Sequence, residues 1–474
     1  MVFSSITFLF IFFPLFLAIY CLLASQFKNA FLLLGSLLFY YWGEPRFVLV
    51  MLASILWNYV AGLLCAYVPD KNRMLGRVLL VVCVSANVGM LFFFKYLDFS
   101  IQTVNQLFSA TIPLKNIALP IGISFFTFQG LSYVVDVYQK RVPPQRSLIN
   151  MGMYISMFPQ LIAGPIVRYA DVEQQIATRS VSRTDFYDGV NRFITGLSKK
   201  TILANTLAYQ ADSIFGESVL SPATAWLGAV FYTLQIYFDF SGYSDMAIGL
   251  GKMLGFSFPE NFNLPYLSKT MTEFWRRWHI SLSTWFRDYV YIPLGGNRRG
   301  NVYFHLIIVF FLTGLWHGAS WNFVLWGLWH GLFLILERLI KKHGRQVSAP
   351  QHPVLFSLLQ HGYTMLVVLV GWVLFRADSL SYAMQYFKAM LGIGKHTLPA
   401  FSTFYYLDGL TVFVLLLGIV FSTDLPPKIA PLLEKHIGST GVQVCASLAR
   451  IGLMLACAGM TMASVYNPFI YFRF

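Results

Sequence analysis

Long apolar runs separated by short polar stretches dominate the pattern of hydrophobic and polar positions along this chain. A helix needs about 20 residues to cross the hydrocarbon core of a bilayer, and runs of that order recur from one end to the other. The clearest runs are Ile6–Ala24, Phe47–Val68, Val78–Leu97, Ala118–Tyr138, Ala223–Ile248, Leu355–Phe375, Leu407–Phe421 and Val442–Val465. Weaker runs lie at Ala30–Trp42 and Asn150–Val167. With the region Val302–Leu339, the pattern predicts on the order of ten or more membrane-embedded helices in one polytopic domain, residues 1–474.

The composition excludes a soluble globular protein. Hydrophobic residues make up 57% of the 474 positions, charged residues only 11%, and the mean hydropathy is +0.61. The formal net charge of +14 comes from Lys and Arg in short loops such as Lys71–Arg77, Lys140–Arg146 and Lys341–Arg345. Such loops are typical of cytoplasmic connections and of contacts with anionic headgroups, so the charge indicates topology and membrane lipids, not nucleic acid.

The segment 251–300 interrupts the apolar pattern with prolines, asparagines and charges among many aromatic residues. In TEFWRRWHISLSTWFRDYVY, the aromatic residues Phe274, Trp278, Trp285 and Tyr289 recur at about helical spacing, with charged residues between them. This predicts a helix that lies in the membrane interface or re-enters a cavity lined by protein. A simple interfacial anchor is the alternative, and it is the one that the pattern alone favours.

The apolar region Val302–Leu339 is too long for one span. As a single helix its 38 residues would run to about 57 Å, nearly twice the hydrocarbon core, so we expect a helical hairpin. Basic residues at Arg298–Arg299 and Arg338–Lys342 put both ends on the cytoplasmic side. The middle, TGLWHGASWN, contains Gly, Ser and Asn, which weaken a helix, so His317 is predicted deep in the bilayer.

The pentapeptide GLWHG occurs twice in this hairpin, and each copy contains a histidine, His317 and, 13 residues later, His330. An ionisable side chain within a membrane is costly and is therefore a candidate functional residue. For His317, a hydrogen bond between helices is an equal alternative, and for His330, near the basic flank, such a structural role is favoured. The sequence has no HxxxH or HxxE spacing for a metal pair, so a metal or haem site is disfavoured.

A neutral imidazole in a dry pocket can take the proton from a hydroxyl as that oxygen attacks a thioester or ester carbonyl, which is acyl transfer by general-base catalysis. The chain lacks a G-x-S-x-G nucleophile elbow and the glycine motifs that hold dinucleotides or ATP. The rival hypothesis is a proton-coupled transporter or flippase in which His317, His279 and Asp239 relay protons. Inverted repeats, which would favour that hypothesis, are not recognisable.

Five blocks of the sequence together carry a resemblance to a known family. They are PIGISFFTFQGLSYVVDVY (Pro120–Tyr138), FPQLIAGPIVR (Phe158–Arg168), QIYFDFSGYSDMAIGLGKMLGF (Gln235–Phe256), FWRRWHISLSTWFRDYVYIPLGGNR (Phe274–Arg298) and TGLWHGASWNFVLWGLWHG (Thr313–Gly331). The set resembles the membrane-bound O-acyltransferase family, and most of all its bacterial branch of alginate O-acetylation proteins, related to the teichoic-acid D-alanyl transferase. The resemblance extends over the whole chain.

The resemblance implies an all-α polytopic membrane fold, a ring of tilted transmembrane helices with re-entrant or interfacial helices around a central tunnel. It implies that His317 is the catalytic histidine and His279 the supporting one. It further implies transfer from a cytoplasmic thioester, acetyl-CoA or an acyl carrier, for O-acetylation of an extracytoplasmic polysaccharide such as an alginate-like polymer or cellulose, without a bound cofactor or metal. The chain would be a multi-pass protein of the bacterial inner membrane, with a periplasmic SGNH-hydrolase-like acetyltransferase as its partner.

Further candidate residues lie around the two histidines. Polar residues within the apolar run YFDFSGYSDM could line the tunnel or orient a histidine, or only join helices by hydrogen bonds, and Trp316 and Asn322 could support His317 in the same way. The residues of that run are Asp239, Ser241 and Asp245.

Two further groups of residues are candidates for contact with the substrates. Four arginines are candidates for the phosphates of the donor, with headgroup contact as the alternative: Arg276, Arg277, Arg298 and Arg299. Tyr471, in the C-terminal sequence Asn467–Phe474, could accept the acyl group as a phenolic ester, or serve only as an interfacial anchor.

Overall fold

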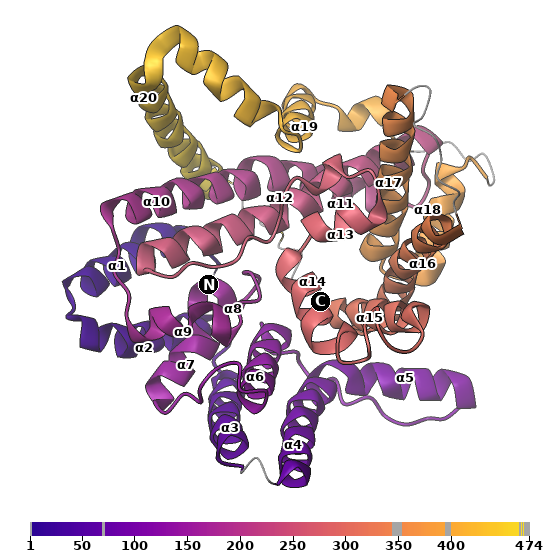
Figure 1. Cartoon of the computed structure of the whole chain (residues 1–474). Helices are drawn as coiled ribbons and strands as arrows, with labels where there is room; N and C mark the ends of the chain where they lie inside the picture. Colours follow the sequence, from indigo (N-terminus) through magenta and orange to yellow (C-terminus); the bar gives the residue numbers. More distant parts are fainter. Residues whose placement is uncertain are drawn as a thin grey trace. The chain divides into compact units, whose positions relative to one another are not determined.

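The computed structural model describes residues 2–68, 72–343, 353–393, 400–463, 466 and 468. These residues form helices joined by turns and loops, and they divide into two compact units, residues 1–193 with 243–259 and residues 194–242 with 260–474 (Figure 1). The all-α architecture expected from the sequence is confirmed. The ring of helices, the central tunnel and the single-domain organisation stay predictions.

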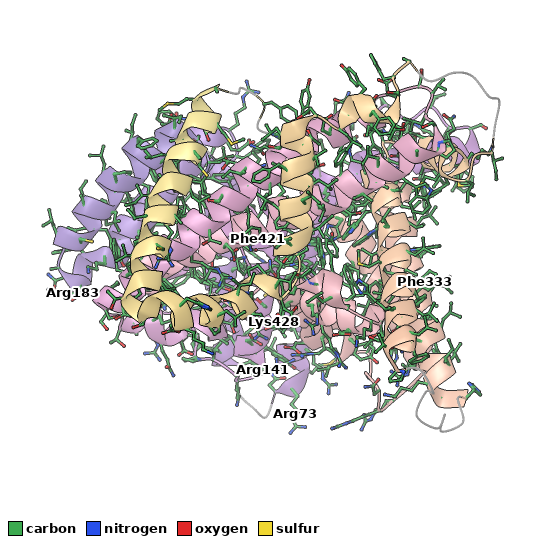
Figure 2. The ribbon with its side chains drawn as sticks, turned by 90° about the horizontal axis from the view of Figure 1, so that it is seen from above. Arg73, Arg141, Arg183, Phe333, Phe421 and Lys428 are labelled. Carbon is green, nitrogen blue, oxygen red and sulfur yellow. The ribbon has the colours of Figure 1, made fainter. Side chains whose placement is uncertain are left out.

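The first unit is built around aromatic side chains from its N-terminal helices. Its helices are α1 (Phe13–Leu22), α2 (Ser25–Gly43), α3 (Val48–Tyr67), α4 (Arg73–Leu91), α5 (Leu97–Phe108), α6 (Ile123–Tyr138), α7 (Leu148–Ser156), α8 (Phe158–Leu161) and α9 (Tyr169–Ala177). The ring of Phe158 lies 5.4 Å from Phe16 and 5.4 Å from Phe39, centroid to centroid, so α8 packs between α1 and α2. In Figure 2, Arg73 and Arg141 lie at the same edge of this unit, as basic residues of one membrane face should.

The second unit contains both copies of GLWHG. Its helices are α11 (Asn205–Phe215), α13 (Met271–Arg277), α14 (Ile280–Phe286), α15 (Val302–His317), α16 (Trp321–His343), α17 (Pro353–Arg376), α18 (Leu380–Met390), α19 (Gly409–Phe421) and α20 (Leu425–Ala463). Two further helices, α10 (Arg183–Ser198) and α12 (Pro222–Leu254), contribute residues to both units. Figure 2 shows Lys428 on the bent connection between α19 and the second limb of α20, which starts at Gly438.

The hairpin expected over residues 302–339 is present. Helix α15 ends at His317, the backbone of Gly318 is extended, and α16 starts at Trp321 and packs against α15. A Cβ on Gly314 would lie 2.3 Å from the carbonyl oxygen of Phe323, and one on Gly327 would lie 2.1 Å from that of Phe310. The first glycine of each GLWHG copy therefore allows the two helices to approach at backbone distance, as small residues do in membrane helix pairs.

The single helix expected over Thr272–Tyr291 is wrong. The chain forms α13, breaks at Trp278 and His279, forms α14, and continues as the π-helical turn η5 (Arg287–Tyr291). The break has a backbone cause, because His279 has φ 46° and ψ 55°, a left-handed conformation that ends a helix. In chain order these short helices follow α12 and the 3-10 turn η4 (Pro265–Leu267), and they precede α15.

Five of the described helical stretches are long and apolar enough to cross a bilayer: Val48–Tyr67, Arg73–Phe108, Trp321–His343, Pro353–Arg376 and Gly438–Ala463. A sixth span is formed if Gly409–Phe421 and Leu425–His436, bent by 74°, count as one. Two further apolar helices, Phe8–Leu22 and Val302–His317, are shorter than a full span, and the total of ten or more membrane-embedded helices stays a prediction. These helices make the chain a multi-pass membrane protein.

The shortened spans have local causes. The run Ala118–Tyr138 becomes helical only at Ile123, after Pro120 and Gly122, whose φ of 77° is left-handed. The run Asn150–Val167 is divided into α7 and α8 by a non-helical Met157 that precedes Phe158 and Pro159. Apolar composition therefore predicted burial correctly in these runs but overestimated the length of the helices.

Candidate active site

His317 is the last residue of α15 and lies in an aromatic enclosure. Its side chain is buried, with a residue exposure of 6%, and its ring meets three aromatic rings edge to face. The centroid distances are 4.9 Å to Trp316, 4.9 Å to Trp326 and 5.1 Å to Phe375. The three aromatic rings shield the imidazole from bulk solvent. In such a low-dielectric environment, the electrostatic interactions that assist proton transfer are stronger than in water.

His279 has a defined hydrogen-bonding arrangement. It is fully buried, and its Nδ1 lies 3.0 Å from Oδ1 of Asn261. The same oxygen accepts hydrogen bonds from the backbone N–H (3.3 Å) and the hydroxyl (2.9 Å) of Ser281. Since a backbone N–H can only donate, Oδ1 is an acceptor, and Nδ1 of His279 must carry the proton. The other nitrogen, Nε2, therefore presents a lone pair and has no hydrogen-bond partner within the described part of the chain.

Trp316 connects the two histidines. Its ring lies 4.9 Å from His317 and 5.8 Å from His279, centroid to centroid, and contacts both of them edge to face. Phe240 of α12 closes the other side of His279 at 4.6 Å. The structure thus brings together three of the residues that the sequence selected, because the rings of His317 and His279 both contact the indole of Trp316.

Asn322 has a structural contact at the turn of the hairpin. Its amide donates to the backbone carbonyl of Ala377, just beyond the end of α17, at 2.6 Å. This bond ties the start of α16 to the end of α17, whose Phe375 packs on His317. Asn322 therefore supports the aromatic enclosure of His317 through the backbone of α17. Within the described part of the chain, its side-chain hydrogen bond goes to Ala377 and not to the imidazole.

His330 occupies a different environment in the middle of α16. Its ring is fully buried and contacts Trp275, Trp326 and Phe274 at 5.1, 5.0 and 6.4 Å. Neither ring nitrogen has a hydrogen-bond partner among the described residues. Gly371 makes room for the ring, since a Cβ there would lie 2.7 Å from Nε2. His330 is thus a packed core residue.

The carboxylates of α12 form ion pairs. Asp239 pairs with Lys200 at 2.6 Å, both side chains almost fully buried, and Lys200 also donates to the carbonyl oxygen of Pro468. Asp245, in the first unit, pairs with Arg192 at 2.6 Å. Ser241 is buried, and its hydroxyl has no hydrogen-bond partner in the residues that the structure describes. No local sequence pattern pointed to Lys200 or Arg192, because each lies tens of residues from the carboxylate with which it pairs.

A cavity of about 280 Å³ opens in the second unit among α13, α14, η5, α15 and α16. Its lining includes the exposed Arg276 and Arg287 and, one helical turn before His317, the buried Thr313. We call it the arginine cavity. Of the four arginines selected from the sequence, only Arg276 lines it. Arg277 instead pairs with Glu273 at 2.9 Å.

The other two arginines lie outside the lining of the arginine cavity. Arg298 and Arg299 are exposed in the turn between η5 and α15. Arg287, which the sequence did not select, takes their place in the arginine cavity. Tyr471 lies outside the described residues, and the nearest described positions are Tyr466 and Pro468.

Comparison with known proteins assigns the family. The model of the membrane-bound O-acyltransferase family matches residues 140–377, half of the chain, and this range contains both GLWHG copies. The chain belongs to the membrane-bound O-acyltransferase family. It is therefore an O-acyltransferase, and the transporter hypothesis loses its support.

Named relatives agree with this assignment. The chain is 40% identical to a probable alginate O-acetylase of Pseudomonas putida over the whole of both chains. It is 34% identical to the peptidoglycan O-acetyltransferase of Helicobacter pylori over 83% of this chain and 80% of that protein. It is 28% identical to the teichoic acid D-alanyltransferase of Bacillus subtilis over 49% of this chain and 62% of that one. The chain is thus a membrane O-acyltransferase with O-acetyltransferases among its relatives.

Proposed function

We propose that this chain transfers an acetyl group from a cytoplasmic thioester, acetyl-CoA or an acyl carrier protein, for O-acetylation of a polysaccharide outside the bacterial inner membrane. The position of His317 carries the proposal, since it is buried among three aromatic rings at the break of the hairpin. Relatives named for the O-acetylation of alginate and of peptidoglycan support an acetyl group and a polysaccharide acceptor. A periplasmic SGNH-hydrolase-like partner completes the transfer in this proposal.

His317 acts as the general base. It removes the proton from an acceptor hydroxyl while that oxygen attacks the carbonyl carbon of the thioester. The carbon–sulfur bond then breaks, the thiolate leaves and takes up a proton, and an oxygen ester remains. The lone pair on Nε2 of His279, fixed by Asn261, supports a role as a second proton acceptor beside Trp316. Tyr471 is the proposed first acceptor, because a phenol needs such a base to become a nucleophile.

The arginine cavity is the proposed donor site. Guanidinium groups suit phosphates, and Arg276 and Arg287 supply two of them next to apolar walls from Leu306 and Phe310. The positive-inside rule supports a cytoplasmic position, because Arg298 and Arg299 precede α15 and the last turn of α16 is basic. Thr313, in the same lining, lies one turn from His317. In this proposal, the thioester end of a donor bound in the arginine cavity needs to extend only one helical turn beyond Thr313 to meet His317.

The test is acetyl transfer by the full chain in proteoliposomes with radiolabelled acetyl-CoA, the partner protein and polysaccharide. Wild type should consume the thioester and label the acceptor, and His317→Gln should lower the rate by a factor of about 10² to 10⁴. Arg276→Gln should raise KM for acetyl-CoA and leave kcat close to wild type, since it touches only the donor. No thioester consumption by wild type would refute the donor, and a normal rate for His317→Gln would refute the base.

A further inference from the structure

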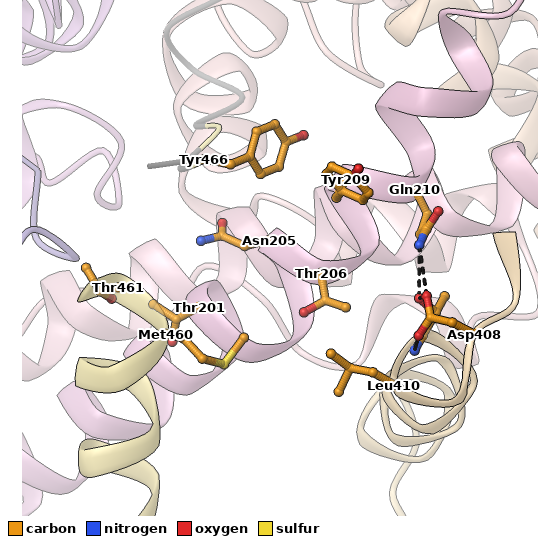
Figure 3. Close-up of a pocket in the computed structure, with 11 residues that line it drawn as sticks. Thr201, Asn205, Thr206, Tyr209, Gln210, Asp408, Leu410, Met460, Thr461 and Tyr466 are labelled. Atoms are coloured by element: carbon orange, nitrogen blue, oxygen red, sulfur yellow. Dashed lines mark hydrogen bonds between the residues drawn. The ribbon is translucent and has the colours of Figure 1, made fainter. Parts of the chain in front are cut away.

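A second cavity in the second unit differs from the arginine cavity in charge. It has a volume of about 340 Å³ and lies between α11, α19 and the end of α20 (Figure 3). Among its described lining residues, Asp408 is the one with a formal charge, and its carboxylate accepts hydrogen bonds from Gln210 (3.3 Å) and Thr411 (2.9 and 2.8 Å). This carboxylate would repel the phosphates of a donor. The arginine cavity is therefore the one of the two that suits an anionic donor.

Helix α13 forms one wall of the arginine cavity, with Thr272, Trp275 and Arg276 in the lining. Thr272 and Arg276 are four residues apart, so they lie on the same face of the helix. Within the described part of the chain, no carboxylate pairs with Arg276, whereas the neighbouring Arg277 pairs with Glu273. Arg276 can thus bind a ligand as long as α13 keeps its position.

A single carboxylate holds the start of α13. The helix has only seven residues, too few to be stable by itself, so its position depends on the rest of the fold. Oε1 of Glu337, on α16, accepts a hydrogen bond from the backbone N–H of Met271. Oε2 accepts from the backbone N–H (3.0 Å) and the hydroxyl (2.7 Å) of Thr272. Tyr363 of α17 donates to Oε1 at 3.4 Å, so Glu337 joins α13 to both α16 and α17.

The carboxylate also suits the first turn of α13 electrostatically. The backbone N–H groups of a first turn have no partner within the helix, and they carry a partial positive charge. Glu337 accepts from those of Met271 and Thr272, and the hydroxyl of Thr270 accepts from that of Glu273 at 3.0 Å. A residue 65 positions away from Thr272 thus completes the cap that the local sequence only begins.

The end of α13 is held separately. The backbone N–H of Asn263 donates to the carbonyl oxygen of Arg277 at 2.9 Å, and the N–H of Ile280 donates to the carbonyl oxygen of Asn261 at 3.0 Å. The side chain of the same Asn261 holds His279. Loss of the hydrogen bonds at the start of α13 therefore leaves the end of the helix and His279 in place.

We propose that Glu337 is a positioning residue for donor binding, because it holds the first turn of α13 so that the face with Thr272 and Arg276 lines the arginine cavity. This inference rests on the proposed function, in which that cavity takes the thioester. Leu334, one turn before Glu337 on α16, lines the same cavity, so the carboxylate lies close to the donor. Glu337 acts on the affinity for the donor and not on the chemical step, since His279 is held from the other end of α13.

The experiment is steady-state kinetics of acetyl-CoA consumption by the full chain in proteoliposomes, with the partner protein and polysaccharide present. Glu337→Ala should raise KM for acetyl-CoA about tenfold and leave kcat within about threefold of wild type. Glu337→Gln keeps one acceptor oxygen but loses the charge, and should raise KM less. Glu434→Ala, which removes an exposed glutamate of α20, is the matched control and should behave as wild type does.

A double-mutant cycle with Arg276→Gln distinguishes positioning from a general loss of stability. If Glu337 acts through the wall that carries Arg276, the two changes are not additive. The double variant should then raise KM by no more than about threefold beyond Arg276→Gln alone. Additive effects on KM, or an unchanged KM in Glu337→Ala, would overturn the inference.

Hydrogen exchange tests the same contact without substrate. The backbone amides of residues 271–275 should exchange at least about tenfold faster in Glu337→Ala than in wild type, while those of α14 should not change. Equal exchange of residues 271–275 would overturn the inference, whereas failure of wild type to consume acetyl-CoA would instead refute the proposed function. If thermal unfolding shows that Glu337→Ala does not fold, Glu337→Gln takes its place, and an unchanged KM and unchanged exchange in that variant would overturn the inference as well.

Discussion

The two copies of GLWHG share five residues and differ in what surrounds their histidines. In each copy the first glycine serves the same purpose, because Gly314 and Gly327 allow α15 and α16 to touch at backbone distance. Their histidines differ because the helix ends directly after His317 and continues past His330. The first glycine of the repeated motif thus serves helix packing, and the place of the helix break gives the two histidines different surroundings.

Trp326 separates the two environments. It lies 4.9 Å from His317 on one side and 5.0 Å from His330 on the other. The ring of His317 contacts Trp316, which in turn contacts His279. The ring of His330 is instead enclosed by Trp275, Phe274 and Gly371. A histidine within a membrane protein therefore needs more than burial to be a catalytic candidate, since the fully buried copy is the packed one.

Exchange of each histidine for glutamine should show the largest difference between the two copies. His317→Gln should lower the rate of acetyl-CoA consumption by a factor of about 10² to 10⁴, because an amide cannot take the proton. His330→Gln should stay within about tenfold of wild type, because it removes no hydrogen bond of the ring. Initial rates at matched expression measure both, and the opposite order of effects would reverse the roles of the two copies.

Removal of the group that orients His279 should have the next largest effect. Asn261→Leu should lower kcat about 10²-fold with little change in KM, because Nδ1 of His279 loses the acceptor that fixes its tautomer. Asn261→Asp keeps an acceptor oxygen and should recover a large part of the loss. Steady-state kinetics of both variants measure this, and equal losses would show that Asn261 only supports the fold.

A methyl group between the two helices should destabilise the hairpin. Gly327→Ala places a Cβ 2.1 Å from the carbonyl oxygen of Phe310 and 3.1 Å from Cα of Gly314, and should lower the free energy of unfolding by about 1 to 3 kcal/mol. Gly452→Ala is the matched control, because nothing lies within 4 Å of its Cβ in α20. Denaturant unfolding in detergent compares the two, and equal stability would contradict the close approach.

Replacement of His330 by an apolar residue of similar size should have the smallest effect. His330→Leu should leave the free energy of unfolding unchanged or raise it by up to about 1 kcal/mol, because both ring nitrogens lack partners. The same unfolding measurement, with wild type as reference, tests this. A loss of well over 1 kcal/mol would show that the ring forms a hydrogen bond in the membrane.

The candidate site was partly predictable because some of its determinants are local. The length of the apolar region 302–339 and its basic flanks predicted a hairpin, and the helix-weakening residues of TGLWHGASWN placed its turn in that stretch, where the structure ends α15 at His317. His317 could therefore be chosen over His330 from the sequence and the family resemblance. The arginines were predicted less well, because ion pairing does not decide which of them line the cavity: Arg277 pairs with Glu273 and Arg287 pairs with Asp288, yet only Arg287 of these two lies in the lining.

The sequence by itself determined that this chain is an all-α membrane protein, where its hairpin turns back and which family it belongs to, because hydropathy, chain length and motif are properties of neighbouring residues. Only the tertiary structure decided the break at His279, its hydrogen bond to Asn261 and the ion pair of Asp239 with Lys200. A left-handed backbone at a non-glycine residue is unfavourable in isolation and persists only when distant parts of the chain hold it. Buried charges likewise depend on partners that lie far away in the sequence.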